Sequence, residues 1–202
     1  MENKDKNQCY QENSGCQERN QDYTENLITR KRMSRDTLFS VACLLVSQRS
    51  TCLRSQVGAV VVKDGRIVSM GYNGPISGMP PCVQPNPLID CLDVKNPYFS
   101  SGEGLEYYQR VCMGPGCTRS LHAETNAIAF AARAGVSVED CILYCTMSPC
   151  INCAKVIVNS GIKELKYLED YRDSAGLELL KKAGIKVTQL DLLWGGEVIL
   201  ND

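Results

Sequence analysis

Two short motifs place metal-binding residue types at the starts of two predicted helices, and one strand lies between them. The first motif is HAE at residues 122–124, which contains the single histidine of the chain, and the second is PCINC at 149–153. Hydrophobic periodicity between them predicts a helix over 121–134 and a strand over 141–146. A helix, strand and helix in this order bring both helix starts to one sheet.

The residue types in the two motifs suit a zinc ion. Cys150 and Cys153 stand at i and i+3 on one face of the first helical turn, where the helix dipole lowers thiol pKa values. His122 adds a third ligand, and three protein ligands leave the fourth zinc position for water, as in catalytic sites. Glu124 is close enough in sequence to take a proton from that water.

Each motif alone has another interpretation. A CxxC pair can be a redox pair or half of a structural zinc knuckle, and a lone histidine can be a hydrogen-bonded core residue. The combination is more specific than its parts, because H-x-E followed by P-C-x-x-C is the signature of zinc-dependent nucleobase deaminases.

The composition narrows the class of protein. A chain of 202 residues fits one compact domain, or one domain with an appendage. Lys and Arg number 22 and Asp and Glu number 23, so no positive field favours binding to a nucleic acid polymer. No secretory h-region or membrane-length apolar run is present, and we expect a cytoplasmic protein without membrane contact. There, twelve cysteines indicate metal ligands, reactive groups or buried small residues.

The chain divides into a tail and one domain. Residues 1–32 are polar and predicted to be disordered, and residues 33–202 form the domain. Ser34 caps a helix in which the apolar residues 38, 41, 42, 45 and 46 have helical spacing. Two β-branched runs joined by Asp64-Gly65 then predict a hairpin. A segment rich in Pro, Gly and Cys follows at about 74–117.

Strands and helices alternate in the second half of the domain. After strand 141–146 we expect helix 149–160, begun by Pro149 and ended by Gly161, then strand 163–169, helix 174–183 and strand 185–190. This alternation predicts an α/β fold of three layers, with a mixed five-stranded sheet and helices on both faces.

The chain resembles deoxycytidylate (dCMP) deaminases and the related late-competence deaminases of bacteria. The resemblance covers residues from about 34 to 190 and is carried by TCLRSQVGAVVVKDGRIVSMGYNGPISGMPPC and LHAETNAIAFAARAGVSVEDCILYCTMSPCINCAKVIVNSGIKELKYLEDY. It implies the cytidine-deaminase-like α/β/α fold and hydrolysis of dCMP to dUMP and ammonia, which supplies dUMP for dTMP synthesis.

The resemblance also implies roles for single residues. His122, Cys150 and Cys153 match the zinc ligands, and Glu124 matches the proton shuttle. Asn73 of the GYNG motif matches a residue that contacts the substrate sugar, although an asparagine there is as well explained as a left-handed turn residue. Tyr171 matches a tyrosine near the phosphate, and packing at a strand end is the alternative.

Arg133 matches a family arginine tied to the phosphate, but it lies about 16 Å from His122 along the helix axis. That distance exceeds the span of a mononucleotide. We therefore expect Arg133 to reach a neighbouring subunit's site or to serve a subunit interface together with Phe130, which predicts a homo-oligomer.

A second, structural zinc is common in the resembled family, where it holds the inserted segment. Cys52 and Cys82 match two of its ligands, and without a second histidine the others would be Cys112 and Cys117, with Cys91 as a competitor. Unrelated thiols are the alternative. We expect Cys43, Cys141 and Cys145 to lie in the core.

Regulation and substrate remain open at this stage. Many members of the resembled family are activated by dCTP and inhibited by dTTP near the loop that here carries Gly71, Gly74 and Gly78, although such a segment is also simply a loop. The rival functions are deamination of another cytosine nucleotide or nucleoside, deamination of an adenosine in tRNA, and a non-catalytic zinc module. The sequence does not separate dCMP from CMP.

Overall fold

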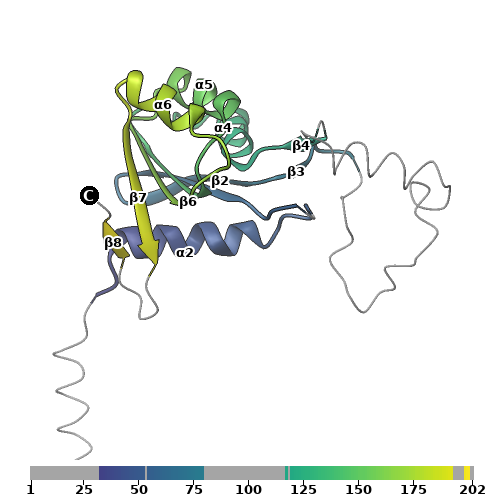
Figure 1. Ribbon diagram of the computed structural model, residues 1–202. Coiled ribbons are helices and arrows are strands. Elements are labelled where there is room, and N and C mark those ends of the chain that lie inside the picture. Colours follow the sequence, from purple (N-terminus) through teal and green to yellow (C-terminus); the bar gives the residue numbers. More distant parts are fainter. Residues whose placement is uncertain (1–31, 53, 80–116, 118, 193–197, 201–202) are drawn as a thin grey trace, which may run out of the picture. The chain divides into compact units, whose positions relative to one another are not determined.

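The computed structural model describes residues 32–52, 54–79, 117, 119–192 and 198–200, and Ser34–Asp202 forms one compact unit (Figure 1). The predicted tail and nearly all of the Cys-rich insert lie outside the described residues. The helices are α2 (Arg35–Ser47), α4 (Ala123–Arg133), α5 (Ile151–Asn159) and α6 (Ala175–Lys182). The strands are β1 (Gly58–Lys63), β2 (Arg66–Tyr72), β3 (Gly74–Pro75), β4 (Ser120–Leu121), β5 (Ile142–Met147), β6 (Glu164–Glu169), β7 (Lys186–Leu192) and β8 (Val198–Leu200).

The predicted mixed sheet is confirmed. Its strand order is β2-β1-β5-β6-β7-β8. Strand β1 pairs antiparallel with β2 and β5, whereas β5, β6 and β7 are parallel. The short strand β8, which the sequence did not predict, extends the five expected strands to six by pairing antiparallel with β7. A separate two-stranded ladder joins β3 to β4, so the end of the GYNG motif lies beside the residues that lead into His122.

Helices cover both faces of the sheet, as expected. Helix α2 lies along one face, and α4, α5 and α6 lie on the other (Figure 1). Alternate residues of β1 supply both cores, because successive strand side chains point to opposite faces. Ala59 and Val61 belong to the core under α4, α5 and α6, while Val60 and Val62 pack with Phe39 of α2. None of the described helices is long and apolar enough to cross a membrane.

The turn between β1 and β2 has the backbone that its sequence predicts. Asp64 has φ 51° and Gly65 has φ 73°, as a two-residue hairpin of type I′ requires. The register shifts between Val61 and Val62, which marks a bulge in the pairing with β2. The hairpin makes β2 an edge strand on which α4 packs: Ser69 Oγ donates to the carbonyl of Ala127 at 2.7 Å.

Helix α2 is capped as predicted, since Ser34 Oγ accepts a hydrogen bond from the Thr37 amide at 3.0 Å. The predicted helix is present, but its evenly spaced apolar residues do not all face the core. Residues 38, 41 and 45 are exposed and 42 and 46 are half-buried against the core, whereas the buried side chains are Thr37, Phe39, Ser40, Cys43 and Ser47.

Close packing against β1 explains which face of α2 is buried. A Cβ atom on Gly58 would lie 2.2 Å from the carbonyl oxygen of Cys43. At such a distance between backbones only small side chains fit between helix and strand, so Ser40, Cys43 and Ser47 face the sheet in place of the leucines.

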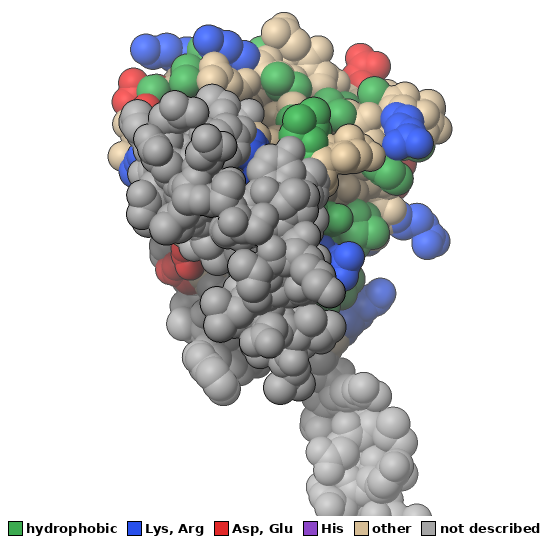
Figure 2. All heavy atoms as spheres, turned by 90° about the vertical axis from the view of Figure 1, so that its right-hand side faces the viewer, with side chains coloured by type: hydrophobic (Ala, Val, Ile, Leu, Met, Phe, Trp, Pro, Cys, Tyr) green, Lys and Arg blue, Asp and Glu red, His purple; other side chains and the backbone are tan. Residues whose placement is uncertain are grey.

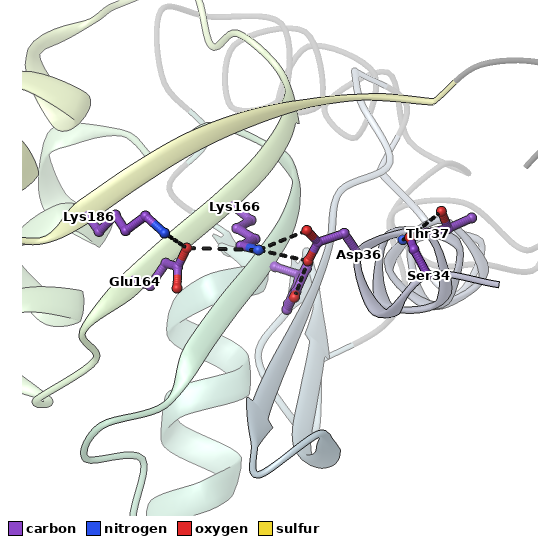
Figure 3. Close-up of polar contacts among 7 residues, drawn as sticks. Ser34, Asp36, Thr37, Glu164, Lys166 and Lys186 are labelled. Carbon is purple, nitrogen blue, oxygen red and sulfur yellow. Dashed lines mark hydrogen bonds and ion pairs between the residues drawn. The ribbon is translucent and has the colours of Figure 1, made fainter. Parts of the chain in front are cut away.

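An ionic network ties the start of α2 to β6 (Figure 3). Lys166 Nζ lies 2.8 Å from Asp36 Oδ1, and Tyr144 Oη donates to the same oxygen at 2.6 Å. Glu164 Oε1 joins this network at 3.8 Å from Lys166 Nζ, and it also lies 3.0 Å from Lys186 Nζ. Burial by itself raises the pKa of Asp36, but the hydrogen bonds from Lys166 and Tyr144 and the positive charge of the lysines outweigh it and hold the pKa below its ordinary value.

We predict that Asp36→Asn lowers the free energy of unfolding by about 1–3 kcal/mol at neutral pH, because Lys166 loses its charged partner. A lowered pKa means that the charged form stabilises the fold above the ordinary value of 3.8 and that this contribution is lost as the pH falls below it. Urea unfolding at pH 7 and at about pH 3 measures the difference. The exposed Glu139→Gln serves as the control, and an Asp36→Asn difference that stays constant with pH would contradict the account.

Candidate metal centre and active site

Three ligand atoms converge where α4 and α5 begin. His122 Nδ1 lies 3.4 Å from Cys150 Sγ and 3.4 Å from Cys153 Sγ. All three atoms lie within 4.8 Å of one another, and no other cluster of this kind occurs among the described residues. A tetrahedral zinc ion with ordinary bond lengths holds its nitrogen and sulfur ligands about 3.5 Å apart, so the observed separations fit zinc.

The positions of the ligands follow from helix capping. His122 is the N-cap of α4 and Cys150 is the N-cap of α5, both with extended backbone, and Cys153 lies in the first turn of α5. The prediction that Pro149 begins this helix is wrong, because the helical residues start at Ile151. Gly161 follows the end of α5 with φ 78°, as predicted. The positive ends of two helix dipoles therefore point at the thiol sulfurs.

The protonation state of each ligand depends on its neighbours. Hydrogen bonds with Cys153 and, to a smaller extent, with His122 lower the pKa of the Cys150 thiol to about 3. The pKa of Cys153 is raised, first by its hydrogen bond with Cys150 and then by burial. The hydrogen bond with Cys150 also raises the pKa of His122. Zinc binding requires two thiolates and a neutral imidazole, so it is accompanied by proton release.

Glu124 lies beside the ligands, in the first turn of α4. Its side chain is only 4% exposed, and burial raises its pKa to about 7. A carboxyl group with this pKa can both accept and donate a proton near neutral pH. The next residue, Thr125, which the sequence analysis missed, also reaches the centre, with its Oγ1 3.5 Å from Cys153 Sγ.

The centre opens into a cavity of about 580 Å³. Its wall includes His122, Glu124 and Cys150 as well as Asn73 and Tyr171, so the structure brings together the residues of the predicted centre and two of the predicted substrate contacts. The wall also includes Arg54, Ser148, Arg172, Asp170 and Asp173, which the sequence analysis did not single out. Their shared position at the cavity could be seen only in the fold, because it brings together loops that are far apart in the sequence.

Asn73 holds the cavity wall in place. Its Oδ1 accepts from the Val57 amide at 2.8 Å, and its Nδ2 donates to the Ser55 carbonyl at 2.9 Å. The left-handed turn alternative is wrong, since Asp64 and Asp140 are the non-glycine residues with positive φ in the described part of the chain. The Nδ2 group carries two hydrogens, so the same amide can anchor the loop and still donate to a ligand.

Tyr171 follows β6 and is half-buried at the cavity. Its amide donates to Ser148 Oγ at 2.7 Å, and the Ser148 amide donates to the Glu169 carbonyl at 2.8 Å. The Arg172 guanidinium lies 5.5 Å from the centre of the Tyr171 ring. Ser148 therefore connects the turn that carries the cysteine ligands to the turn that carries Tyr171 and Arg172.

Arg133 does not lie on the cavity wall. It is exposed in the last turn of α4, at the end of the helix opposite His122, and Phe130 is 56% exposed one turn earlier. This placement agrees with the expectation that Arg133 cannot reach the site of its own chain.

Apart from Cys150 and Cys153, the described cysteines fall into two groups. Cys43, Cys141 and Cys145 are buried, as expected for core residues. Cys52 and Cys117 are half-buried and lie on the wall of the same cavity. Cys82, Cys91 and Cys112 lie outside the described residues.

Two glycines are required by close approach next to the site. A Cβ on Gly71 would lie 2.4 Å from the Ala127 amide nitrogen, and a Cβ on Gly176 would lie 2.0 Å from the Pro149 carbonyl oxygen. Gly71 therefore allows α4 to pack on β2, and Gly176 allows α6 to pack on the turn that carries Cys150.

The fold and the three-ligand centre agree with comparisons to known proteins. Residues 33–169 match the model of the cytidine and deoxycytidylate deaminase zinc-binding region, and the chain belongs to this family. It is 38% identical over 186 residues to deoxycytidylate deaminase of Enterobacteria phage T4, a match that covers 77% of this chain and 89% of the relative. It is 35% identical over 163 residues to ComE operon protein 2 of Bacillus subtilis, covering 80% and 74%.

A solved structure supports the same assignment. The crystal structure of dCMP deaminase from the cyanophage S-TIM5, in complex with dCMP and dUMP, superposes with a TM-score of 0.59. The two chains are 31% identical, and the superposition covers 75% of this chain and 93% of the other. The chain is therefore a member of a family of zinc-dependent deaminases and carries the His-Cys-Cys centre of that family.

We predict that Gly176→Ala lowers zinc affinity about 10–100-fold, because the added methyl group displaces the Pro149 carbonyl and with it Cys150. Competition with a chromogenic chelator, at a temperature where the variant stays folded, measures the affinity. Gly58→Ala is the control, since its Cβ would meet the Cys43 carbonyl at 2.2 Å, on the other face of the sheet. Equal losses of zinc affinity in both variants would show that destabilisation alone is responsible.

Proposed function

We propose that the protein hydrolyses dCMP to dUMP and ammonia. The observation that carries the proposal is the three-ligand centre at the wall of a cavity, with the buried carboxyl group of Glu124 beside it. A purely structural zinc site closes with four protein ligands and has no use for such an acid.

The residues of the chain divide the chemistry among them. His122, Cys150 and Cys153 would hold zinc, which acidifies a water molecule at its open position. Glu124 would accept a proton from that water and pass it to N3 of the cytosine ring, while the water oxygen bonds to C4. Glu124 would then take the second proton of that oxygen and give it to the amine, so that the C4–N bond breaks and ammonia leaves. One water is consumed and one ammonia is released, so the ring becomes uracil.

Two arginines on the cavity wall favour a nucleotide over a nucleoside. The guanidinium groups of Arg54 and Arg172 present planar donor pairs that match phosphate oxygens. Asp170 and Asp173 lie on the same wall and disfavour a second or third phosphate by charge repulsion. Asn73, with a spare amide hydrogen, and Tyr171 would contact the sugar and phosphate. A monophosphate fits this balance of charges.

The rival functions lack a comparable observation. Deamination of CMP or cytidine uses the same centre, and the relation to ComE operon protein 2 does not select a substrate. For tRNA, the Lys and Arg side chains on the face drawn in Figure 2 stand in several separate groups, with Asp and Glu side chains on the same face. A non-catalytic zinc module does not explain why Glu124 is buried beside the ligands.

We also propose the second zinc. Cys52 and Cys117 approach the same cavity from separate segments, and with Cys82 and Cys112 they would form a four-thiolate site that brings the zinc content to about two per chain. Such a site would anchor the Cys-rich insert at the rim of the active site. The thiolate ligands suit a reducing compartment, the cytoplasm.

The proposal also includes regulation by nucleotides and assembly into a homo-oligomer. The turn after β3 contains Gly78, which is exposed, has φ 90° and would meet no atom within 4 Å among the described residues if a Cβ were added. Its exposed backbone is suited to approach by phosphates, which supports dCTP and dTTP as effectors. The exposed Phe130 and Arg133 at the end of α4 support a homo-oligomer.

We predict that ammonia release is fastest with dCMP among dCMP, CMP, deoxycytidine and dCTP. Glu124→Ala should reduce kcat by at least about 10²–10⁴-fold, because the proton shuttle is lost, while the zinc content is unchanged. Glu139→Ala, an exposed carboxylate far from the cavity, is the control. Activity on deoxycytidine alone would show that the substrate is a nucleoside, and absence of turnover on all four, with or without dCTP as activator, would favour the non-catalytic module.

We predict that Arg172→Ala raises KM for dCMP about 10–100-fold, because a charged hydrogen bond to the phosphate is lost. Deoxycytidine has no phosphate, so its kcat/KM should not change. Steady-state kinetics on both substrates measure the contrast, and Arg66→Ala, at the exposed start of β2, is the control. A parallel loss on both substrates would assign Arg172 to the shape of the cavity instead of to the phosphate.

A further inference from the structure

The two thiol ligands of the metal centre lie in different surroundings. Cys150 is half-buried and belongs to the cavity wall, so water can reach its sulfur. Cys153 is only 3% exposed and does not belong to the cavity wall that the described residues form. A cysteine must lose its proton to bind a metal, and a buried negative charge is costly unless a hydrogen-bond donor faces it. Cys153 therefore needs a donor from the protein itself.

Thr125 places a hydroxyl group at that sulfur. Its Oγ1 lies 3.5 Å from Cys153 Sγ, which is a hydrogen-bonding distance for an atom as large as sulfur. Thr125 is the third residue of α4 after the N-cap His122, and Cys153 is the third residue of α5 after the N-cap Cys150. The arrangement of the helix starts that brings the ligands together therefore also brings Thr125 to Cys153.

The hydroxyl group must be the donor in this contact when a metal is bound. A thiol can donate a hydrogen bond as well as accept one, but a thiolate has no hydrogen and can only accept. A threonine in a helix commonly gives its hydroxyl hydrogen to a backbone carbonyl three or four residues earlier. In the described part of the chain, the hydroxyl group of Thr125 contacts Cys153 Sγ instead. Its one hydrogen is thus available to the ligand.

We propose that Thr125 is a positioning residue of the metal centre, whose hydroxyl group donates a hydrogen bond to the Cys153 thiolate, stabilises its charge and fixes the direction of its sulfur. Such a bond withdraws electron density from the sulfur, so less of it reaches a bound zinc ion. Two thiolates and a neutral imidazole leave zinc with no net charge, so this withdrawal strengthens the polarising effect of the ion at its open position.

The test replaces zinc with Co²⁺, because bonds from thiolates to cobalt absorb near-ultraviolet light as charge moves from sulfur to metal. Thr125→Val keeps the branched shape of the side chain but removes the hydroxyl group. We expect the sulfur-to-cobalt absorption of this variant to shift to longer wavelength, since the sulfur holds its electrons less tightly without the hydrogen bond. Thr125→Ser keeps the hydroxyl group, and its absorption should stay at the wild-type wavelength.

Zinc affinity gives a second measurement on the same variants. Thr125→Val should bind zinc about 10–100-fold more weakly in competition with a chelator, because metal binding then leaves a buried thiolate without its donor. Thr125→Ser should recover most of this loss. Thr188→Val is the matched control, since Thr188 is also half-buried but lies on β7, outside the cavity wall that the described residues form. It should leave both the absorption and the affinity unchanged.

Two results would overturn this role of Thr125. An unshifted absorption in Thr125→Val would show that the hydroxyl group does not act on the sulfur, and equal shifts in the valine and serine variants would assign the effect to packing. If the valine variant does not fold, a crystal structure of the zinc-loaded wild-type protein decides. Thr125 Oγ1 should remain at the 3.5 Å from Cys153 Sγ found here, whereas a hydroxyl group turned to a helix carbonyl would contradict the role.

The role of Thr125 requires the zinc centre, and only its effect on turnover rests on the proposed deamination of dCMP. Cobalt absorption and zinc affinity are both measured without substrate. A protein that shows the expected shift in Thr125→Val but releases no ammonia from dCMP would therefore contradict the proposed function and leave the role of Thr125 standing.

Discussion

Three ligand atoms can meet at one zinc ion here only because α4 and α5 begin side by side. His122 and Cys150 are the N-caps of these helices, and Cys153 lies one turn further. Parallel strand β5 returns the chain from the end of α4 to the start of α5, so the order of the elements determines where the ligands lie. The same helix ends place positive backbone dipoles at the thiolates and place Glu124 in a buried first turn.

Close backbone contacts keep this geometry in place. Gly71 lets α4 pack directly on β2, and Gly176 lets α6 pack directly on the turn before α5. Ser148 and Asn73 then tie the surrounding loops to that frame through side-chain hydrogen bonds to backbone groups. The zinc ligands, Glu124 and the loops that carry Tyr171 and Arg172 are thus held together by these close contacts and hydrogen bonds at the cavity wall.

The parts of the fold that depend on local signals were predictable from the sequence. The cap at Ser34, the turn at Asp64-Gly65 and the helix end at Gly161 each depend on residues close by in the sequence. The spacing of the two motifs located the centre. The buried face of α2 was not predictable, because the close approach of β1 at Gly58 reverses the usual preference for large apolar residues inside. Strand β8 was missed because it is only three residues long. The sequence did not identify Arg54, Ser148 and Arg172 as residues of the site, because they come from separate loops that meet only at the cavity of the folded chain.

The central claim is that His122, Cys150 and Cys153 hold a zinc ion whose fourth position is open toward Glu124. A crystal structure with data collected on both sides of the zinc absorption edge tests it directly. The account predicts an anomalous peak about 2.3 Å from each sulfur and about 2.0–2.1 Å from His122 Nδ1, with a water molecule as the remaining ligand near the Glu124 carboxyl group. A disulfide between Cys150 and Cys153, or a fourth protein ligand on the ion, would contradict it.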